Sequence, residues 1–470
     1  MKPTFRADPL GTSDPTKERM KTMAIKSHDV KKAGQMYWDE KMETMPAAEI
    51  QKLQLRKLKE TVAWVYERVP FYRQKLDEKG VKPNSIKSLE DIARLSFTVK
   101  NDLRDNYPFG LCAVPLTEVV RVHASSGTTG KPITGPYTAD DLNDWTDCMA
   151  RTLWAAGVRP DDIAQNAYGH GLFTGGLGFH QGISRIGCTL VPTSSGLTER
   201  QITLMKDFGA TALFCTPSYA LTIAERAKEL KVDIRTLPLR VGVFGAEPWS
   251  TAMRLEIEER MGIKAQEAYG LTELCGPGVG FDCVAQDGIH INEDHFLAEI
   301  IDPQTHEVLP LGEKGELVFT SLQRRAMPML RYRTKDITRL RREKCACGRT
   351  FIKMDKIFGR SDDMLIISGV NVFPSQIESL LLEIPEVEPQ YRLVVRKKGY
   401  LDQLTVQVEG KKEIYDAGPE KRLEVAAKVS AHIKGNMGIG VDVALVEPKF
   451  INRSEGKALR VVDERPKQFR

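Results

Sequence analysis

The sequence lacks the features that would tie it to a membrane or to nucleic acid. No uninterrupted apolar run approaches the roughly 18 to 20 residues that a bilayer-spanning helix needs. Its 68 basic and 63 acidic residues leave a net charge of only +5. A basic stripe with interleaved aromatic residues, the usual footprint of nucleic-acid binding, is missing as well. We therefore expect no membrane and no nucleic acid as partners, and the small positive charge is only a weak indication of an anionic ligand.

Cysteine is scarce, and so is any sign of export. Eight cysteines in 470 residues are too few for a disulfide scaffold. Residues 1–32 are charged throughout and have no apolar core of the kind that a secretory signal requires. We therefore expect a cytoplasmic protein whose thiols are reduced.

The pattern of apolar residues predicts an α/β protein. Hydrophobic residues make up 41% of the chain, the balance of a globular protein. From Pro70 to about residue 250, strand-like runs alternate with helical runs, which is typical of parallel sheet covered by helices. Between residues 296 and 340 the strands are shorter and are joined by glycine and proline turns. Beyond residue 361, the order helix, strand, strand, helix, strand indicates a small unit of split βαβ type.

We expect two domains. The large domain, residues 1–361, would hold mixed and parallel sheets flanked by helices, with a β-rich subdomain at about 285–355. The small domain, residues 362–470, would be α+β. Near its start, Ser375 and Glu378 have the spacing of a capping box that begins a helix.

A loop rich in glycine and hydroxyl side chains, SSGTTGKP, occupies residues 125–132. Such a loop suits a phosphate cradle, because backbone N–H groups converge on an anion where side chains do not obstruct them. It is not a Walker loop, since only two residues separate Gly127 from Gly130 and a proline follows Lys131. Its flanks predict a strand, a loop and a strand. An ordinary exposed turn has the same composition and stays the alternative.

Further motifs follow in a fixed order. They are HGLFTGGLGFHQG at 170–182, GAEP at 245–248, YGLTE at 269–273, RYRTKD at 331–336, GRSDDMLIISGVNVFPSQIE at 359–378 and NRSEGKALR at 452–460. With SSGTTGKP, these motifs resemble the adenylate-forming, or AMP-binding, enzyme family and, within it, the phenylacetate-coenzyme A ligase branch. The resemblance covers the chain from about residue 35 to the end and implies the fold of that family.

The resemblance implies a two-step reaction with ATP and coenzyme A. A carboxylate would attack the α-phosphate of ATP to give an acyl-adenylate and pyrophosphate, and the thiol of coenzyme A would then displace AMP. The substrate would be phenylacetate or another aryl or arylacetic acid. Loading of a separate carrier protein stays open as an alternative. Family members are often dimers, so a homodimer is compatible with the resemblance, although the sequence indicates no interface.

A third alternative is a nucleotide-binding or nucleic-acid-binding module that is stabilised by zinc and has no catalytic activity. Lys457 and Glu273, which the resemblance makes catalytic, are both intact. Their presence argues against this alternative.

The resemblance also gives roles to the nucleotide-binding residues. The β- and γ-phosphates would be held by Ser126, Thr128, Thr129, Gly130 and Lys131. The adenine would be framed by Gly245, Ala246, Glu247 and Tyr269, and Gly270 would also lie at the nucleotide. Asp336 would accept the ribose hydroxyls, and Arg360 would bind the ribose or a phosphate.

Three residues would be catalytic. Thr272 would hydrogen-bond the α-phosphate, and Glu273 would hold Mg²⁺, which prefers hard carboxylate oxygen. Taken alone, this pair is more typical of a helix N-cap followed by a first-turn acid. Lys457 would offset the charge that builds as two anions approach each other. Its domain would close for the first step and turn away for the second about Asp362, whose alternative is an ordinary turn residue.

The acyl pocket and a metal site complete the prediction. The resemblance suggests an acyl pocket formed by Tyr168, Phe173, Gly175 and Gly176, although a glycine-rich loop and helix start has the same composition. A structural zinc ion would be bound by Cys283, His290, Cys345 and Cys347. The C-x-C spacing is less specific than paired C-x-x-C motifs, so free thiols are an equal alternative. Cys275 is a possible substitute ligand.

Overall fold

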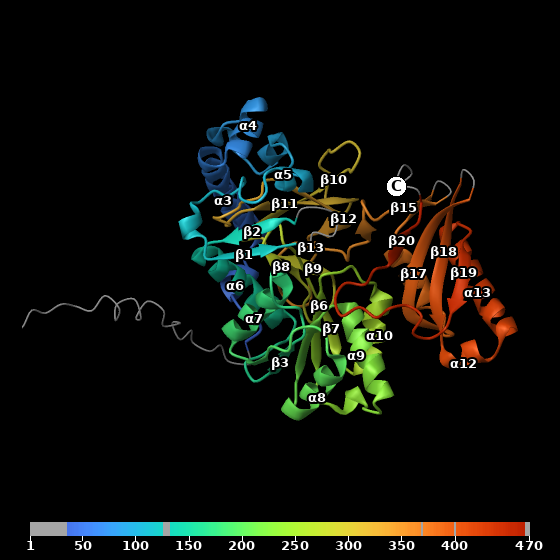
Figure 1. The fold of residues 1–470 in the computed structure, drawn as a ribbon. Helices are drawn as coiled ribbons and strands as arrows, with labels where there is room; N and C mark the ends of the chain where they lie inside the picture. The colour runs from blue at the N-terminus through green and yellow to red at the C-terminus, as the bar shows by residue number, and fades with distance from the viewer. Residues whose placement is uncertain (1–34, 126–131, 368–369, 399–400, 466–470) are drawn as a thin grey trace, which may run out of the picture.

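The computed structural model describes residues 35–125, 132–367, 370–398 and 401–465. Figure 1 shows a large N-terminal body, coloured blue to yellow, beside a smaller C-terminal body in orange and red. Helices alternate with strands through most of the large body, which confirms the expected α/β class. In the described part of the chain, no helix combines the length and apolar composition needed to cross a membrane.

Several helices precede the first strand. They include α2 (Glu40–Glu43), α3 (Ala47–Arg68), α4 (Pro70–Glu78) and α5 (Lys100–Asp105). The buried face of α3 carries Leu58, Val62 and Val65, which recur three or four positions apart and pack into the core of the large domain. Pro70 occupies the first position of α4, where a helix needs no N–H donor.

A twelve-stranded sheet runs through the large domain in the order β10-β11-β12-β13-β9-β8-β7-β6-β5-β3-β4, with β14 paired to β12. Its parallel part consists of β3 (Ile163–Asn166), β4 (Thr189–Val191), β5 (Ala212–Cys215), β6 (Val241–Gly245) and β7 (Lys264–Leu271). The helices of this part are α6 (Ala139–Ala155), α7 (Thr174–Ile186), α8 (Thr198–Phe208), α9 (Pro217–Glu229) and α10 (Thr251–Met261). Strand pairing therefore brings the carboxyl ends of β6 and β7 side by side.

The antiparallel strands continue the same sheet. They are β8 (Gly276–Phe281), β9 (Ile289–Ile291), β10 (Phe296–Ile301), β11 (Lys314–Ser321), β12 (Tyr332–Arg341), β13 (Lys353–Met354) and β14 (Gly359–Arg360). The strands expected in a β-rich subdomain are joined to the parallel strands through the antiparallel pair of β7 and β8. Residues of the large domain that lie far apart in sequence can therefore meet along one sheet.

A two-stranded hairpin flanks the predicted phosphate loop. It consists of β1 (Arg121–Ala124) and β2 (Thr134–Tyr137), which pair antiparallel. The two strands predicted on either side of this segment are therefore confirmed. The following loop residues lie outside the described part of the chain: Ser126, Thr128, Thr129, Gly130 and Lys131.

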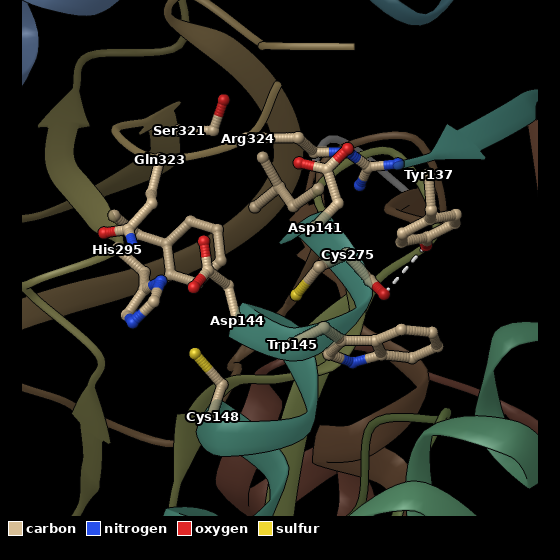
Figure 2. Close-up of a pocket in the computed structure, with 12 residues that line it drawn as sticks. Tyr137, Asp141, Asp144, Trp145, Cys148, Cys275, His295, Ser321, Gln323 and Arg324 are labelled. Carbon is tan, nitrogen blue, oxygen red and sulfur yellow. Dashed lines mark hydrogen bonds between the residues drawn. The ribbon is translucent and has the colours of Figure 1, made fainter. Parts of the chain in front are cut away.

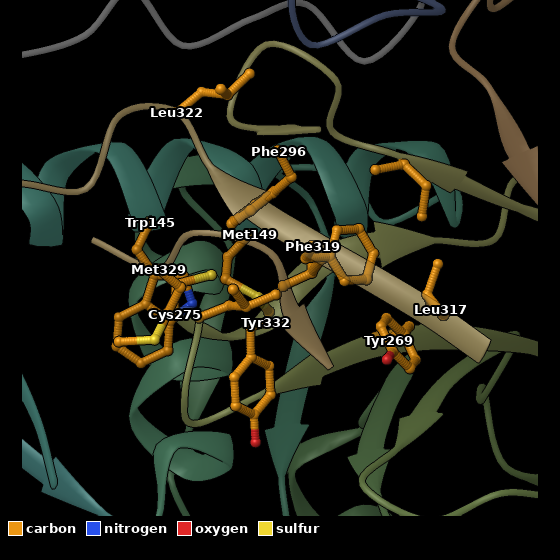
Figure 3. Packing of buried hydrophobic residues seen from close by; sticks show 14 of the residues in the cluster. Trp145, Met149, Tyr269, Cys275, Phe296, Leu317, Phe319, Leu322, Met329 and Tyr332 are labelled. Carbon is orange, nitrogen blue, oxygen red and sulfur yellow. The ribbon is translucent and has the colours of Figure 1, made fainter. Parts of the chain in front are cut away.

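An aromatic cluster supports the centre of the large domain. Figure 3 shows Phe296, Phe319 and Tyr269 among the buried side chains there. The ring of Phe319 lies 6.2 Å from that of Phe296 and 6.2 Å from that of Tyr269, measured between centroids. Tyr269 is thus held by packing at the end of β7, where a candidate site residue needs to be fixed.

The small domain is an α+β unit with its own core. Its elements are β15 (Leu365–Ile367), β16 (Val370–Val372), α11 (Pro374–Leu381), β17 (Val387–Lys398), β18 (Leu401–Gly410), α12 (Lys412–Asp416), α13 (Pro419–Met437), β19 (Asp442–Val446) and β20 (Val461–Asp463). The four-stranded sheet has the order β19-β18-β17-β20. The buried face of α13 carries Val425, Val429 and Ile433. The sequence pattern did not predict β20, which pairs with β17 over three residues.

The predicted capping box of Ser375 and Glu378 is wrong. Helix α11 begins at Pro374, and the backbone N–H of its N-cap Phe373 donates to the side chain of Gln376 at 3.0 Å. Proline at the first position moves the helix start upstream. The hydroxyl of Ser375 donates to the carbonyl of Phe358 instead, at 2.6 Å.

Candidate active site

The turn after β6 brings the GAEP motif to the edge of the parallel sheet. A side chain at Gly245 would put its Cβ 2.2 Å from the carbonyl oxygen of Ala268, so only glycine allows this approach of β6 to β7. Ala246 adopts a left-handed conformation with φ of 74°. Strain of this kind in a non-glycine residue is typical of functional turns. The turn directs Glu247 away from the sheet and toward the small domain.

The carboxylate of Glu247 has a partner in each domain. It accepts the backbone N–H of Ser218 in α9 at 2.8 Å and the backbone N–H of Ala458 in the small domain at 2.8 Å. Glu247 therefore joins the predicted adenine-binding turn to the loop that carries the predicted catalytic lysine.

Tyr269, Asp336 and Arg360 form one connected group. The hydroxyl of Tyr269 donates to Asp336 at 2.5 Å, and Arg360 donates to the other carboxylate oxygen at 3.0 Å. Pairing of β12 with β14 puts Asp336 directly opposite Arg360. Burial raises the pKa of the Asp336 carboxyl, and the charge of Arg360 opposes this rise. The structure thus brings together three residues predicted for the nucleotide.

The predicted hinge residue belongs to the same group. Asp362 lies in a turn after β14 and accepts hydrogen bonds from Arg360 Nε at 3.0 Å and from Arg360 Nη2 at 2.9 Å. One guanidinium therefore connects the end of the large domain to the beginning of the small one.

Thr272 and Glu273 lie in the turn between β7 and β8, so the helix N-cap alternative is wrong. Both residues are buried. Gly270 lies just before them, and a Cβ there would be 1.9 Å from the carbonyl oxygen of Gly276, which makes this turn tight. The ammonium of Lys100 is 3.7 Å from the Glu273 carboxylate. Sequence reasoning missed Lys100, because nothing in its local pattern distinguishes it from a surface lysine.

Lys457 lies in the loop between β19 and β20, which Figure 1 shows in red reaching from the small domain toward the large one. Its Nζ is 5.9 Å from the centroid of the Phe173 ring. Although Lys457 keeps contact with solvent, the surrounding protein desolvates the ammonium and lowers its pKa, and Glu247 opposes this shift. The predicted catalytic lysine therefore meets the predicted acyl pocket at Phe173.

Of the four predicted acyl-pocket residues, Tyr168 and Phe173 lie between β3 and α7, and Gly175 and Gly176 lie in the first turn of α7. Tyr168 stacks on Phe179 with a centroid distance of 4.6 Å. A Cβ at Gly175 would be 2.5 Å from the ring of Phe173, and one at Gly176 would be 2.4 Å from a backbone carbonyl oxygen. These glycines therefore give room first to Phe173 and to the neighbouring backbone. Gly175 and Gly176 occupy the first turn of α7, which agrees with the alternative that this glycine-rich stretch begins a helix.

A small pocket lies beside the turn between β7 and β8 and is separate from the predicted acyl pocket. Figure 2 shows Cys275, Asp144 and His295 among its lining residues, with the hydroxyl of Tyr137 donating to the carbonyl of Cys275 at 2.9 Å. Its volume of about 30 Å³ is far below the several hundred Å³ of a usual ligand site. We therefore assign neither the acid nor the nucleotide to it.

Cys283, His290, Cys345 and Cys347 come together in the interior. Their four ligand atoms lie within 4.8 Å of one another, and all four residues are buried. The Cys283 and Cys345 sulfurs are 3.6 Å apart, and the Cys347 sulfur is 3.5 Å from His290 Nε2. Among the described residues this is the single group with metal-binding geometry, and Cys275 does not belong to it.

Comparisons with known proteins agree with this arrangement. A family model described as AMP-binding enzyme matches residues 46–324, and one described as AMP-binding enzyme C-terminal domain matches residues 369–465. The chain is 50% identical over 440 residues to a phenylacetate-coenzyme A ligase of Thermus thermophilus, an alignment that covers 91% of this chain and 99% of that protein.

Solved structures of one ligase resemble the chain to different degrees. The crystal structure of 2-hydroxyisobutyryl-CoA ligase in the postadenylation state has a TM-score of 0.88 and 31% identity, covering 92% of this chain and 94% of that one. The thioesterification state of the same ligase, with 32% identity and coverage of 93% and 94%, has a TM-score of 0.69.

Proposed function

Because the chain belongs to the AMP-binding enzyme family, we propose that it activates phenylacetate or a closely related arylacetic acid. It is an ATP-dependent acid-coenzyme A ligase that forms AMP. The proposed acid follows from the similarity to the Thermus ligase, and the partly exposed ring of Phe173 beside Lys457 suits an aromatic substrate.

The position of Lys457 is the observation that carries this proposal. Its ammonium lies beside the ring of Phe173, and the carboxylates of Glu247 and Glu273 both act on its charge. A cation at this point would stabilise the charge that develops as the acid oxygen attacks the α-phosphate of ATP. The product of this step would be the acyl-adenylate, and pyrophosphate would leave.

Several buried groups suit the nucleotide. The ionised carboxylate of Asp336 would accept both ribose hydroxyls, and Tyr269 would hold that carboxylate in place through their hydrogen bond. Thr272 would donate to the α-phosphate. The Glu273 carboxylate is buried and lies 3.7 Å from its cationic neighbour Lys100, and its hard oxygens are of the kind that Mg²⁺ prefers. Mg²⁺ bound there would neutralise phosphate charge, and Lys100 would add a second positive group.

The two steps would use two arrangements of the small domain. The higher TM-score to the postadenylation state supports an arrangement suited to the first step. For the second step, the small domain would turn about Asp362 and withdraw Lys457, so that the coenzyme A thiol could reach the acyl-adenylate. Turning would require Arg360 to release Asp362, to which it is bound.

A structural zinc ion is a separate part of the proposal. Tetrahedral zinc with sulfur and nitrogen ligands implies sulfur-sulfur distances of about 3.8 Å and sulfur-nitrogen distances of about 3.5 Å. The distances among Cys283, Cys345, Cys347 and His290 fit these values. The imidazole Nδ1 of His290 lies 3.2 Å from the carbonyl of Phe351, which orients Nε2 toward the sulfurs.

Pyrophosphate release across a panel of acids tests the proposed function. Arylacetic, benzoic and fatty acids would each be supplied with ATP, with and without coenzyme A. We expect release to depend on the acid, to be fastest with phenylacetate, and to be followed by thioester formation when coenzyme A is present. Fastest release with an aliphatic acid would reject the arylacetate assignment, and thioester formation only on a carrier protein would reject coenzyme A as the acceptor.

A further inference from the structure

Two backbone groups that flank Lys457 are bonded to the large domain. On one side, the hydroxyl of Thr216 donates to the carbonyl of Gly456 at 2.9 Å. On the other side, the N–H of Ala458 donates to Glu247 Oε2 at 2.8 Å. Hydrogen bonds therefore hold the loop to the large domain at the residue immediately before the lysine and at the residue immediately after it.

Both anchors come from rigid parts of the large domain. Thr216 is the N-cap of α9 and accepts the N–H of Tyr219 at 3.2 Å. Glu247 follows the strained Ala246 and uses its second oxygen, Oε1, to accept the N–H of Ser218 in the first turn of the same helix, at 2.8 Å. A carboxylate is favoured at a helix N-terminus, and its hydrogen bonds are stronger than those of a neutral acceptor.

The geometry points to Glu247 as a positioning residue that holds the Lys457 loop on the large domain during adenylate formation. This inference rests on the proposed ligase function and adds a role that the adenine-framing expectation does not contain. Oε1 stays on α9 in either arrangement, whereas Oε2 binds Ala458 only while the small domain is closed. Glu247 thus acts through the lysine loop and selects the first of the two arrangements.

The other contacts across the same interface are made by residues that are not adjacent to Lys457. In the same loop, Arg453 binds the carboxylate of Glu225 in α9 through Nε and Nη2, each at 2.7 Å. Arg460 lies 3.5 Å from the Ser218 hydroxyl and 3.7 Å from Glu378. Arg260 and Glu388 form an interdomain ion pair at 2.9 Å, partly exposed to solvent. These pairs therefore serve as controls for general domain docking.

Glu247→Gln is the variant that tests the inference. Glutamine keeps the shape of the side chain but offers one acceptor oxygen, and its NH₂ group would face the second N–H donor. We expect the kcat of acid-dependent ATP-pyrophosphate exchange to fall about tenfold or more, as loss of one charge-assisted hydrogen bond implies. The KM for ATP and the rate of thioester formation from supplied acyl-adenylate should each stay within about twofold of wild type, since the loop acts in neither.

A double-mutant cycle identifies the group through which Glu247 acts. In a Lys457→Ala background, Glu247→Gln should change the residual exchange rate by less than about twofold. Glu388→Gln is the matched control at the interface and should leave both half-reactions near wild type. If Glu247→Gln lowers the melting temperature, Ala458→Pro removes the same N–H from the other partner and should give the same selective loss.

Three outcomes would overturn the inference. A higher KM for ATP with unchanged kcat would make Glu247 an adenine contact. Equal losses in both half-reactions, or a full effect of Glu247→Gln in the Lys457→Ala background, would reject an action through the lysine loop. If wild-type protein shows no acid-dependent exchange, the proposed function fails; if only the variant is indistinguishable from wild type, the positioning role alone fails.

Discussion

Asp336 and Arg360 face each other across the paired strands β12 and β14, with the guanidinium 3.0 Å from the carboxylate. The other edge of the same guanidinium binds Asp362. The side chain of Arg360 therefore connects Asp336, which is predicted to bind the ribose, to Asp362, which is predicted to be the hinge. This connection relates nucleotide binding to domain movement, and the predictions below separate the two.

Replacing Lys457, the proposed catalytic lysine, should affect only the first step. We expect Lys457→Ala to slow ATP-pyrophosphate exchange by about 100- to 1000-fold, the usual effect of removing one group that stabilises charge in the transition state. Thioester formation from supplied acyl-adenylate should change little, because in the proposed mechanism the small domain would withdraw Lys457 for that step. Both half-reactions can be followed separately by single-turnover assays. Equal loss of both would contradict the domain-turning account.

The pH dependence of the first step should report the ammonium of Lys457. Desolvation lowers its pKa from the ordinary value of 10.5, so the positive form is lost at a lower pH than in free lysine. The rate of adenylate formation, measured as kcat/KM for exchange, should therefore fall as the pH rises through this lowered pKa. In Lys457→Arg the alkaline fall should move to higher pH, since a guanidinium stays charged. An alkaline fall at the same pH in both proteins would assign it to another group.

Lys100 should support the nucleotide phosphates from the large domain. Lys100→Ala removes the cation that lies 3.7 Å from Glu273, and we expect about a tenfold lower kcat/KM for ATP in the exchange assay. Lys100→Arg keeps the charge and should retain most of the activity. Lys87→Ala, at an exposed lysine, is the control for a general charge effect. Wild-type kinetics in Lys100→Ala would remove this residue from the site.

Asp362 should govern the second step more than the first. Proline at this position fixes φ and removes an N–H, so Asp362→Pro should slow thioester formation about tenfold or more while exchange persists. Asp362→Ala removes the ion pair to Arg360 without restricting the backbone, and it separates that contact from hinge rotation. If Asp362→Pro and Asp362→Ala behave alike in both assays, the effect belongs to the ion pair and not to the hinge.

Purified protein should contain about one equivalent of zinc, as expected for four converging sulfur and imidazole ligands. Metal analysis and thermal melting before and after chelation measure both the occupancy and the stabilisation. Cys345→Ser should lose the metal and melt at a lower temperature. Cys275→Ser, at a buried thiol outside the group, should keep the metal. Absence of zinc from wild-type protein grown with added zinc would leave the four residues as unmetallated side chains.

Local patterns in the sequence predicted much of the fold. Alternating strands and helices between β3 and β7 follow from periodicity, because each segment carries its own apolar face. The continuation of that sheet through β7 and β8 did not follow, since pairing between strands is a long-range choice. Glu378 shows the limit most clearly. Its spacing from Ser375 indicates a helix cap, yet its carboxylate accepts the N–H of Ser250 in the other domain at 3.1 Å.

Some residues of the candidate site could be predicted from the sequence, and others could not. The predicted residues Tyr269, Asp336 and Arg360 belong to motifs, and the resemblance of these motifs to the AMP-binding enzyme family gives them their expected roles. Lys100 and Thr216 belong to no such pattern. Their proposed roles rest on contacts with Glu273 and Gly456, which are distant in the chain and become neighbours only in the fold.

The N-terminal segment packs against the cysteine-rich group, and this contact has a consequence for folding during translation. The hydroxyl of Tyr37 donates to the carbonyl of Cys347 at 3.2 Å, and the N–H of Thr350 donates to the carbonyl of Glu43 at 3.0 Å. The first helices leave the ribosome long before the residues that receive them. The N-terminal segment must therefore wait through the translation of nearly the whole large domain before it can dock.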